Sequence, residues 1–176
     1  AGEVESTQDN GVRFRVETVA SGLEVPWSIA FAPDGRMFIT ERPGRVRVFE
    51  NGKLRPQPVA TIEDVRSASE SGLMGLVLHP QFASNHLLYL SYAYAGGDGQ
   101  LVRVVRYRET GDALTERKVI IEGIPAAPNH AGCRLRFGPD GKLYVTTGDA
   151  TDRELAQKMD SLAGKTLRLN DDGSVP

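Results

Sequence analysis

His130 and Asp149 are the residues of this sequence best suited to move a proton. His130 stands in a Pro-, Asn- and Gly-rich segment immediately before a predicted strand, which places it in a loop that can face a ligand. An imidazole takes up a proton near neutral pH, and a carboxylate bonded to its second nitrogen fixes the tautomer and raises the basicity. Asp149 ends the strand that pairs back along the same hairpin, so we expect it beside His130. The alternative is a structural histidine whose hydrogen bonds are satisfied within the fold.

The other two histidines and the cysteine do not indicate a second catalytic or metal site. His79 precedes a proline at a turn and His86 follows an asparagine in a polar loop, so both are interpreted as turn or surface residues. Three histidines in all disfavour a multi-histidine metal site. Cys133 excludes an intramolecular disulfide and is interpreted as a small buried apolar group. Asp171 and Asp172 lack the usual calcium-loop pattern and predict a hairpin turn.

Two glycine-containing segments remain. Glu70-Ser-Gly-Leu-Met-Gly75 starts polar and feeds an apolar strand, and its glycines indicate that the backbone approaches another part of the molecule closely. The Gly-Gly-Asp-Gly run at 96–99 has neither the spacing nor the following lysine of a phosphate-binding loop, so we interpret it as a flexible turn.

An internal repeat of roughly 50 residues predicts the elements that position these side chains. Ile29–Glu41 and Leu135–Thr147 each consist of a strand, a Pro-Asp-Gly turn and a second strand, and Leu76–Ser91 is a third copy with a longer turn. Pro presets φ in such a turn, Asp bonds its own following backbone, and Gly supplies a positive φ. Each copy therefore predicts an antiparallel hairpin.

Further strands follow the hairpins. Gly44–Lys53 resembles Gly164–Gly173: each is an alternating strand closed by an Asn-Gly or Asp-Gly turn, after its own Pro-Asp-Gly hairpin. Leu101–Arg108 alternates as a strand should, and Lys118–Glu122 follows it.

The best helix signal is the segment 152–163. Leu155, Met159 and Leu162 fall on one side of it, and Thr151 or Asp152 could cap its start. We expect a short helix within a loop between strands.

The repeat predicts an all-β fold of four-stranded propeller blades. A two-sheet sandwich, which also has short strands and turns, is the alternative. Three repeats exhaust the chain, whereas a propeller closes with at least four blades and more often six or seven. We therefore expect about three blades, with the ring completed by remaining chain or by a second copy, because an open arc leaves sheet faces unburied. The predicted domains are a polar N-terminal extension, residues 1–12, and half of a propeller, residues 13–176.

Charge and apolar patterning exclude other classes. The 21 Lys and Arg residues against 23 Asp and Glu give a formal charge of −2, and no basic stripe is present, so we expect no nucleic-acid partner. The longest apolar runs, such as Leu73–Leu78 and Leu87–Leu90, have the size of buried strands, so no membrane span is expected. Residues 1–10 are polar, look like the start of a processed or trimmed chain, and are compatible with export.

Six segments match, in order, the motifs of one known family. From about Arg13 onward the chain resembles the soluble PQQ-dependent aldose sugar dehydrogenases, which are glucose/sorbosone dehydrogenase-like propellers. The matching segments are Val25-Pro-Trp-Ser-Ile-Ala-Phe-Ala-Pro-Asp-Gly35, Thr40-Glu-Arg-Pro-Gly-Arg-Val46, Glu70-Ser-Gly-Leu-Met-Gly-Leu76, Asn129-His-Ala-Gly-Cys-Arg134, Phe137-Gly-Pro-Asp-Gly-Lys-Leu-Tyr-Val-Thr-Thr-Gly-Asp149 and Gly164-Lys-Thr-Leu-Arg-Leu169.

The resemblance implies a six-bladed propeller that binds PQQ with Ca²⁺ in its central cleft and oxidises the anomeric carbon of aldoses to lactones. It implies that His130 removes the C1 hydroxyl proton while hydride passes from C1 to the quinone, and that Asp149 orients His130. It also implies that Glu70 lines the cofactor site, with Arg134 in a supporting role. The electron acceptor so implied is cytochrome-type or an artificial dye, and the implied location is periplasmic or secreted.

Two departures from the family pattern matter. Cys133 stands where the pattern usually has glycine. The family's Arg-Asn pair, the basic residues that hold the PQQ carboxylates and the carbonyls that bind calcium belong to the second half, so we expect this chain alone to be inactive. The alternative functions are a binding or scaffold propeller without catalysis and, ranked last, a hydrolytic propeller such as a lactonase.

Overall fold

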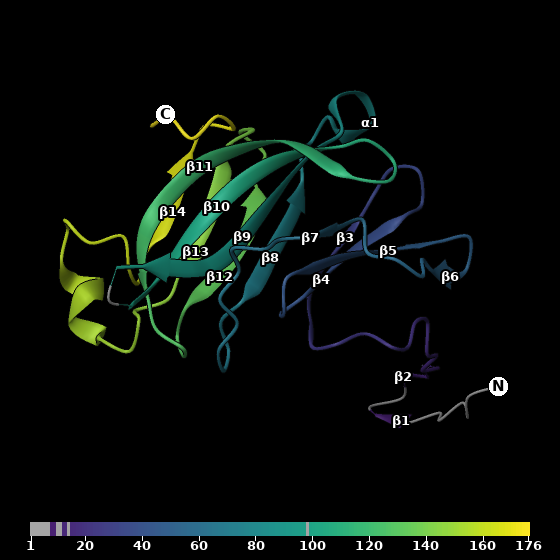
Figure 1. The fold of residues 1–176 in the computed structure, drawn as a ribbon, viewed down its shortest axis with the longest axis horizontal. Coiled ribbons are helices and arrows are strands. Elements are labelled where there is room, and N and C mark those ends of the chain that lie inside the picture. The colour runs from purple at the N-terminus through teal and green to yellow at the C-terminus, as the bar shows by residue number, and fades with distance from the viewer. Residues whose placement is uncertain (1–7, 10–11, 14, 98) are drawn as a thin grey trace.

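The computed structural model describes residues 8–9, 12–13, 15–97 and 99–176 (Figure 1). In this part of the chain no helix is long and apolar enough to cross a membrane. Most of the expected extension, residues 1–12, lies outside the described residues, and its described parts belong to a two-stranded hairpin. The elements in order are β1 (Gln8–Asp9), β2 (Val12–Arg13), β3 (Pro26–Phe31), β4 (Met37–Glu41), β5 (Arg45–Glu50), β6 (Lys53–Leu54), β7 (Ala60–Thr61), β8 (Leu73–Leu78), α1 (Phe82–Asn85), β9 (Leu87–Gly96), β10 (Gly99–Glu109), β11 (Leu114–Ala126), β12 (Gly132–Phe137), β13 (Leu143–Thr147), the 3₁₀ helix η1 (Arg153–Gln157) and β14 (Thr166–Leu169).

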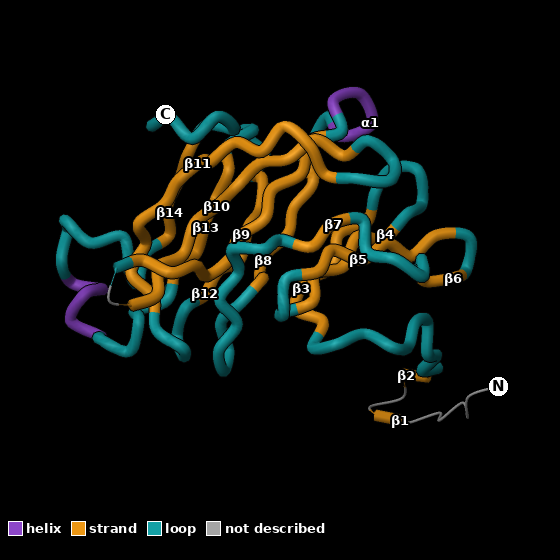
Figure 2. The backbone as a smooth tube through the Cα atoms, in the orientation of Figure 1, coloured by secondary structure: helices purple, strands orange, loops and turns teal. Residues whose placement is uncertain are grey.

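The larger sheets are three antiparallel meanders that follow one another along the chain (Figure 2). The first has the order β3-β4-β5-β6, with β7 also paired to β5; the second has the order β11-β10-β9-β8, and the third β12-β13-β14. Strand β8 contacts both β3 and β12, so the first strands of the three sheets lie side by side. Consecutive meanders grouped around their first strands are blades of a β-propeller. The prediction of an all-β fold with about three blades is confirmed, and the described sheets form an open arc.

The middle sheet is apolar on both faces because it packs between the other two. Successive strand residues point to opposite faces. Along β9, Leu88 and Leu90 therefore pack toward the first sheet, whereas Leu87 and Tyr89 pack toward the third. Two cores result, one in each space between neighbouring blades. Their fully buried members include Phe38, Val46, Val48, Leu73 and Tyr92 in the first core, and Met74, Val104, Ile124, Leu135 and Val145 in the second.

The three predicted hairpins are confirmed as β3–β4, β8–β9 and β12–β13. In both Pro-Asp-Gly turns the glycine has a positive φ, +88° at Gly35 and +72° at Gly141. The carboxylates of Asp34 and Asp140 each accept a hydrogen bond, at 3.1 Å, from the backbone N–H two residues later. In the longer third copy the turn is formed by the single-turn helix α1.

The short helix expected within 152–163, between two strands, is present, but it covers only Arg153–Gln157. Asp152 caps the start, as expected, but the helix is the 3₁₀ turn η1, and Met159 beyond it is 94% exposed rather than packed with Leu155 and Leu162. The Lys165 ammonium donates to two carbonyl oxygens of η1, at 2.9 and 3.0 Å. Because these carbonyls are already satisfied, the chain ends the helix without losing hydrogen bonds.

His79 occupies a turn, as predicted, but it is not a surface residue. Its side chain is 12% exposed, and the ring lies against Tyr89 of its own sheet and edge-on to Phe137 of the third sheet. This burial lowers the pKa of His79. The sequence places the residue at a turn, but only the docking of the third sheet covers it. His86, at 48% side-chain exposure, is the exposed loop residue that the sequence predicts.

Glu109, at the end of β10, is a buried carboxylate that joins the first two sheets. It accepts hydrogen bonds from the Arg36 guanidinium at 2.8 and 3.2 Å and from the Gly111 N–H at 2.7 Å, and its side chain is 2% exposed. Glu109→Ala removes the buried one of the two carboxylate partners of Arg36, which keeps Asp34, so we expect the free energy of unfolding to fall by about 1.5–3 kcal/mol. Urea denaturation measures this change.

The same ion pair predicts an acid sensitivity. Burial raises the pKa of Glu109, but the hydrogen bonds and charge of Arg36, together with the Gly111 N–H, hold the pKa below its ordinary value. The stabilisation is therefore present above the unfolded-state pKa and is lost as the pH falls through the folded-state pKa. A control is Glu116→Ala, which removes an exposed pair with Arg108 on the same sheet and should cost less than about 1 kcal/mol. Equal losses in the two variants would contradict a special role for Glu109.

Candidate active site

Three loops meet at the end of the blades where β8 and β12 begin. They are the pre-β8 loop (residues 66–72), the pre-β12 loop (127–131) and the post-β13 loop (148–152). The Glu70 N–H donates to the Pro128 carbonyl at 3.0 Å, which joins the first two loops, and the Ala150 N–H donates to the His130 carbonyl at 3.2 Å, which joins the last two. The three loops therefore form one hydrogen-bonded surface.

His130 and Asp149 lie in contact on this surface. His130 Nδ1 and Asp149 Oδ1 are 2.9 Å apart, and the imidazole side chain is 61% exposed. Asp149 Oδ1 also accepts a hydrogen bond from the Thr151 N–H at 3.0 Å, which fixes the carboxylate. The geometry matches the sequence expectation and differs from a histidine buried within the fold. The roles of the two residues in a reaction stay predictions.

The hydrogen bond from His130 lowers the pKa of Asp149. We therefore expect His130→Asn to raise the pKa of the Asp149 carboxyl toward its ordinary value, which ¹³C NMR titration measures. The hydrogen bond from His130 favours the charged carboxylate, so its contribution to stability is lost as the pH falls through the folded-state pKa of Asp149. His86→Asn, at an exposed site elsewhere, should leave the Asp149 titration unchanged.

Gly148 allows the two loops to approach. A Cβ atom at this position would lie 1.7 Å from the His130 carbonyl oxygen and 2.5 Å from the His130 carbonyl carbon, so no side chain fits. Gly132, with a φ of +78°, fits in the same way against the backbone N of Gly148. The Thr-Thr-Gly-Asp motif thus places Asp149 at hydrogen-bonding distance because its glycine lets the main chain of His130 pass.

Glu70 reaches the same place from the neighbouring blade. Its carboxylate Oε2 accepts a hydrogen bond from the His130 backbone N–H at 3.0 Å. The structure therefore brings together three of the predicted site residues, two from one hairpin and one from a loop 60 residues earlier. A role for Glu70 toward a cofactor stays a prediction.

Among the described residues, no hydrogen bond or ion pair joins the Arg134 side chain to these three side chains. It is exposed on β12, and its guanidinium carbon lies 5.7 Å from the centre of the Trp27 ring on β3. Trp27 was not singled out from the sequence as a site residue. The sequence feature that could have indicated Trp27 is the Val-Pro-Trp motif at the start of β3, but matching a motif does not show that the Trp27 ring lies near Arg134. The supporting role predicted for Arg134 is untested.

Cys133 is fully buried, as predicted for a small apolar group. Burial raises its pKa to about 12, so the thiol stays protonated at neutral pH. A Cβ atom on Gly75 would lie 2.5 Å from the Cys133 carbonyl oxygen. The close backbone approach predicted for the Glu70–Gly75 segment is thus confirmed at Gly75.

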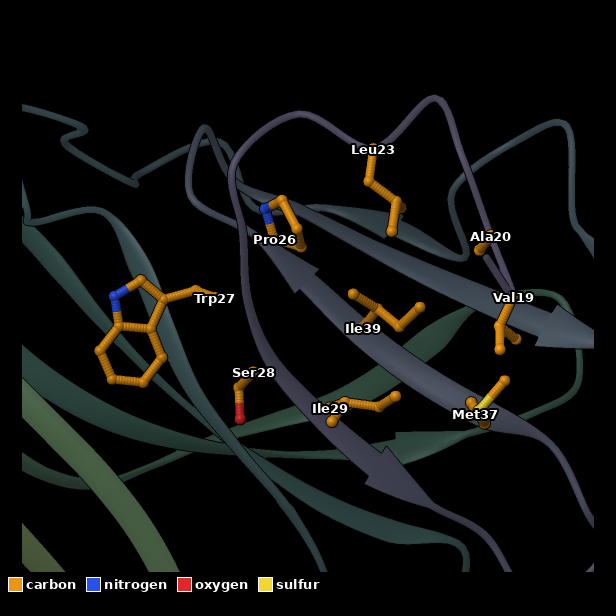
Figure 3. A pocket seen from close by; sticks show the side chains of 9 residues that line it. All are labelled: Val19, Ala20, Leu23, Pro26, Trp27, Ser28, Ile29, Met37 and Ile39. Carbon is orange, nitrogen blue, oxygen red and sulfur yellow. The ribbon is translucent and has the colours of Figure 1, made fainter. Parts of the chain in front are cut away.

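An apolar pocket of about 280 Å³ lies away from His130, on the open face of the first sheet (Figure 3). Figure 3 shows the side chains of Val19, Leu23, Ile39 and Met37 turned toward one another, whereas the Trp27 ring points away from them. The pocket contains none of the proton-handling residues. It is part of a sheet face without a neighbouring blade among the described residues.

The fold and the site define a β-propeller arc with an exposed His–carboxylate pair at the start of its inner strands. The chain belongs to the glucose/sorbosone dehydrogenase family, whose model matches residues 23–176. The aldose sugar dehydrogenase YliI of Escherichia coli (strain K12) is 36% identical over 167 residues, which cover 92% of this chain and 45% of that protein.

Two further relatives are informative. The PQQ-bound aldose sugar dehydrogenase of Streptomyces coelicolor has a TM-score of 0.78 and 32% identity, over 90% of this chain and 48% of that one. The Hedgehog-interacting protein of Mus musculus is 33% identical over 181 residues, which cover 89% of this chain and 26% of that protein. The chain spans about half the length of the two dehydrogenases, and the family resemblance seen in its sequence is confirmed.

Proposed function

We propose that this chain supplies the proton-handling half of a dehydrogenase that oxidises the anomeric carbon of aldoses to lactones. The observation that carries the proposal is the exposed His130 imidazole held by Asp149 at 2.9 Å. Family membership and the similarity to an aldose sugar dehydrogenase that binds PQQ support it.

In the proposed reaction the Asp149 carboxylate accepts a hydrogen bond from the Nδ1–H of His130, so the lone pair of Nε2 is free to act as a base. Nε2 takes the proton of the C1 hydroxyl while the C1–H bond breaks and the C1–O bond becomes a carbonyl. The imidazolium that forms is stabilised by the Asp149 carboxylate. When bound, PQQ would supply the two-electron acceptor for the hydride that leaves C1.

The residues present fit the proton transfer, but they are not sufficient to hold the cofactor. A quinone with three carboxylates needs positive charge around it, whereas Asp149 and Glu70 place carboxylates beside His130. Among the described residues no three His, Cys, Asp or Glu side chains converge on a possible metal site. We therefore propose that the cations for PQQ and the ligands for Ca²⁺ come from the second half of the propeller.

We propose further that this second half differs from the present chain. The open face of the first sheet is apolar, with Ile29 42% and Phe31 71% exposed, whereas the open face of the third sheet carries exposed Arg134, Arg136 and Arg168. Two copies that closed a ring would press the apolar face of one against the arginines of the other. Arg168 would keep its partner Asp140, but the guanidinium of Arg136 would lose water without gaining a partner from an apolar face. Solution mass measurement tests this: a closed two-chain ring of identical copies that binds PQQ would overturn it.

The activity is tested by mixing this chain with the remaining half, PQQ, Ca²⁺ and an aldose, and following reduction of an artificial dye. We expect dye reduction only when both halves and PQQ are present. No reduction above the PQQ-free control would count against the proposed function. A cytochrome-type acceptor is a proposal based on the family alone. A periplasmic or secreted location is also a proposal based on the family alone, and cell fractionation of the full-length protein would test it.

A second candidate is a binding propeller without catalysis. The similarity to a protein named for its interaction with Hedgehog favours it. Retained sugar or quinone binding with no turnover, in the presence of both halves, would be its sign.

A further inference from the structure

The main chain of His130 is held from two sides: its carbonyl accepts a hydrogen bond from the post-β13 loop, and its N–H bonds the neighbouring blade. Its N–H donates to Glu70 Oε2 at 3.0 Å, and the Pro128 carbonyl two residues earlier accepts the Glu70 N–H at 3.0 Å. The Ser69 hydroxyl donates to Asn129 Oδ1 at 2.5 Å. The pre-β8 loop thus holds three consecutive residues of the pre-β12 loop.

Arg42, which follows β4 of the first blade, holds the pre-β8 loop in turn. Its guanidinium donates to the Ser69 carbonyl, and its own carbonyl accepts the Leu73 N–H at 2.9 Å. A Cβ atom on Gly72 would lie 2.4 Å from the Arg42 carbonyl oxygen and 2.6 Å from Arg42 Cγ. Glycine at 72 therefore lets the stem of Arg42 lie directly along the loop.

The backbone of both loops depends on these contacts. Ser69 has a φ of +51° and His130 a φ of +55°, a region that non-glycine residues keep only when their surroundings fix them. Ser69 is fixed by its carbonyl and hydroxyl contacts, and His130 by Glu70 and by the post-β13 loop. Without Arg42 or the Ser69 hydroxyl, the pre-β12 loop loses one of its supports and the His130 ring its fixed approach to Asp149.

We propose that Arg42 and Ser69 are positioning residues for His130: they fix the pre-β8 loop, and this loop holds the His130 main chain so that the imidazole meets Asp149. The functional part of this inference rests on the proposed function. The structural part does not, and it is tested separately.

The structural test uses Arg42→Ala and Ser69→Ala in this chain, with amide hydrogen exchange read residue by residue. The His130 and Glu70 amides should exchange at least about tenfold faster, while amides of β9 stay protected and so report an intact fold. Ser84→Ala is the matched control, because its hydroxyl also donates a hydrogen bond to an oxygen atom, the Gln81 carbonyl, but lies in α1. Unchanged exchange at His130 and Glu70 in both variants would overturn the proposal.

The functional test uses the same variants in the full-length protein with PQQ. We expect kcat to fall by about 10–100-fold while KM for the aldose changes little, because the base is misplaced but the sugar site is not. Arg42→Lys, which keeps a donor near the Ser69 carbonyl, should recover part of the loss. An unaltered kcat overturns the positioning role. If the parent protein has no activity, the proposed function fails, and the exchange result alone decides whether Arg42 and Ser69 position His130.

Discussion

His130→Asn in the full-length protein should lower kcat for aldose oxidation by about 10²–10⁴-fold, the range expected when a general base is removed. The asparagine amide cannot take up the C1 hydroxyl proton, whereas the loops that carry it keep their hydrogen bonds to the backbone of residue 130. Steady-state kinetics with dye reduction measures the effect. KM for the aldose should change little, because the base contributes to the transition state rather than to sugar binding.

The matched control is His86→Asn. The two histidines have almost the same φ, +54° at His86 and +55° at His130, and asparagine tolerates a positive φ well. Both side chains are exposed, and His86 lies in the loop after α1. Backbone effects therefore cancel between the variants. If both variants lost the same activity, or if neither lost any, His130 would not be the base.

The fold was predictable where its signals are local. A Pro-Asp-Gly turn fixes a hairpin within about a dozen residues, so the β3–β4 and β12–β13 hairpins follow from turn chemistry alone. No such signal predicts the pairing of β7 with β5. Strand β7 has only two residues, follows a proline-rich loop, and pairs with a strand that already belongs to the sheet. The short helix before β14 was also predictable, but its end at Gln157 was not, because Lys165, which bonds its last carbonyls, lies eight residues further along the chain.

The part of the site that lies within one hairpin was predictable from the sequence, and the part that depends on contacts between blades was not. His130 and Asp149 flank one hairpin, 19 residues apart, so pairing of β12 with β13 brings them together. The contact of Glu70 with His130 joins residues 60 apart, and it depends on how two blades dock. Periodicity does not describe blade docking, so the supporting role inferred for Arg42 could be found only in three dimensions. The only sign of it in the sequence is Gly72, and the reason for a glycine there is clear only from the structure, where Arg42 packs against it.

Gly148→Ala should remove most of the activity, by about 10²-fold, with a smaller loss of stability of about 1–3 kcal/mol. A Cβ atom 1.7 Å from the His130 carbonyl oxygen cannot be accommodated unless one loop moves by more than an ångström. Either movement breaks the Ala150 N–H bond to that carbonyl and separates the His130 ring from Asp149. The measurement pairs kcat in the full-length protein with urea denaturation of the same sample.

Substitutions of two glycines on the second blade distinguish loss of stability from displacement of His130 as the cause of lost activity. Gly99→Ala adds a Cβ atom that meets no atom within 4 Å, so activity and stability should both stay near the parent values. Gly75→Ala places its Cβ atom 2.5 Å from the Cys133 carbonyl between two blades, so it should cost stability in the core. If activity loss followed stability loss alone, kcat of the folded fraction would stay at the parent value in both Gly75→Ala and Gly148→Ala. A drop in kcat confined to Gly148→Ala would instead require that the distance between His130 and Asp149 controls the proton transfer.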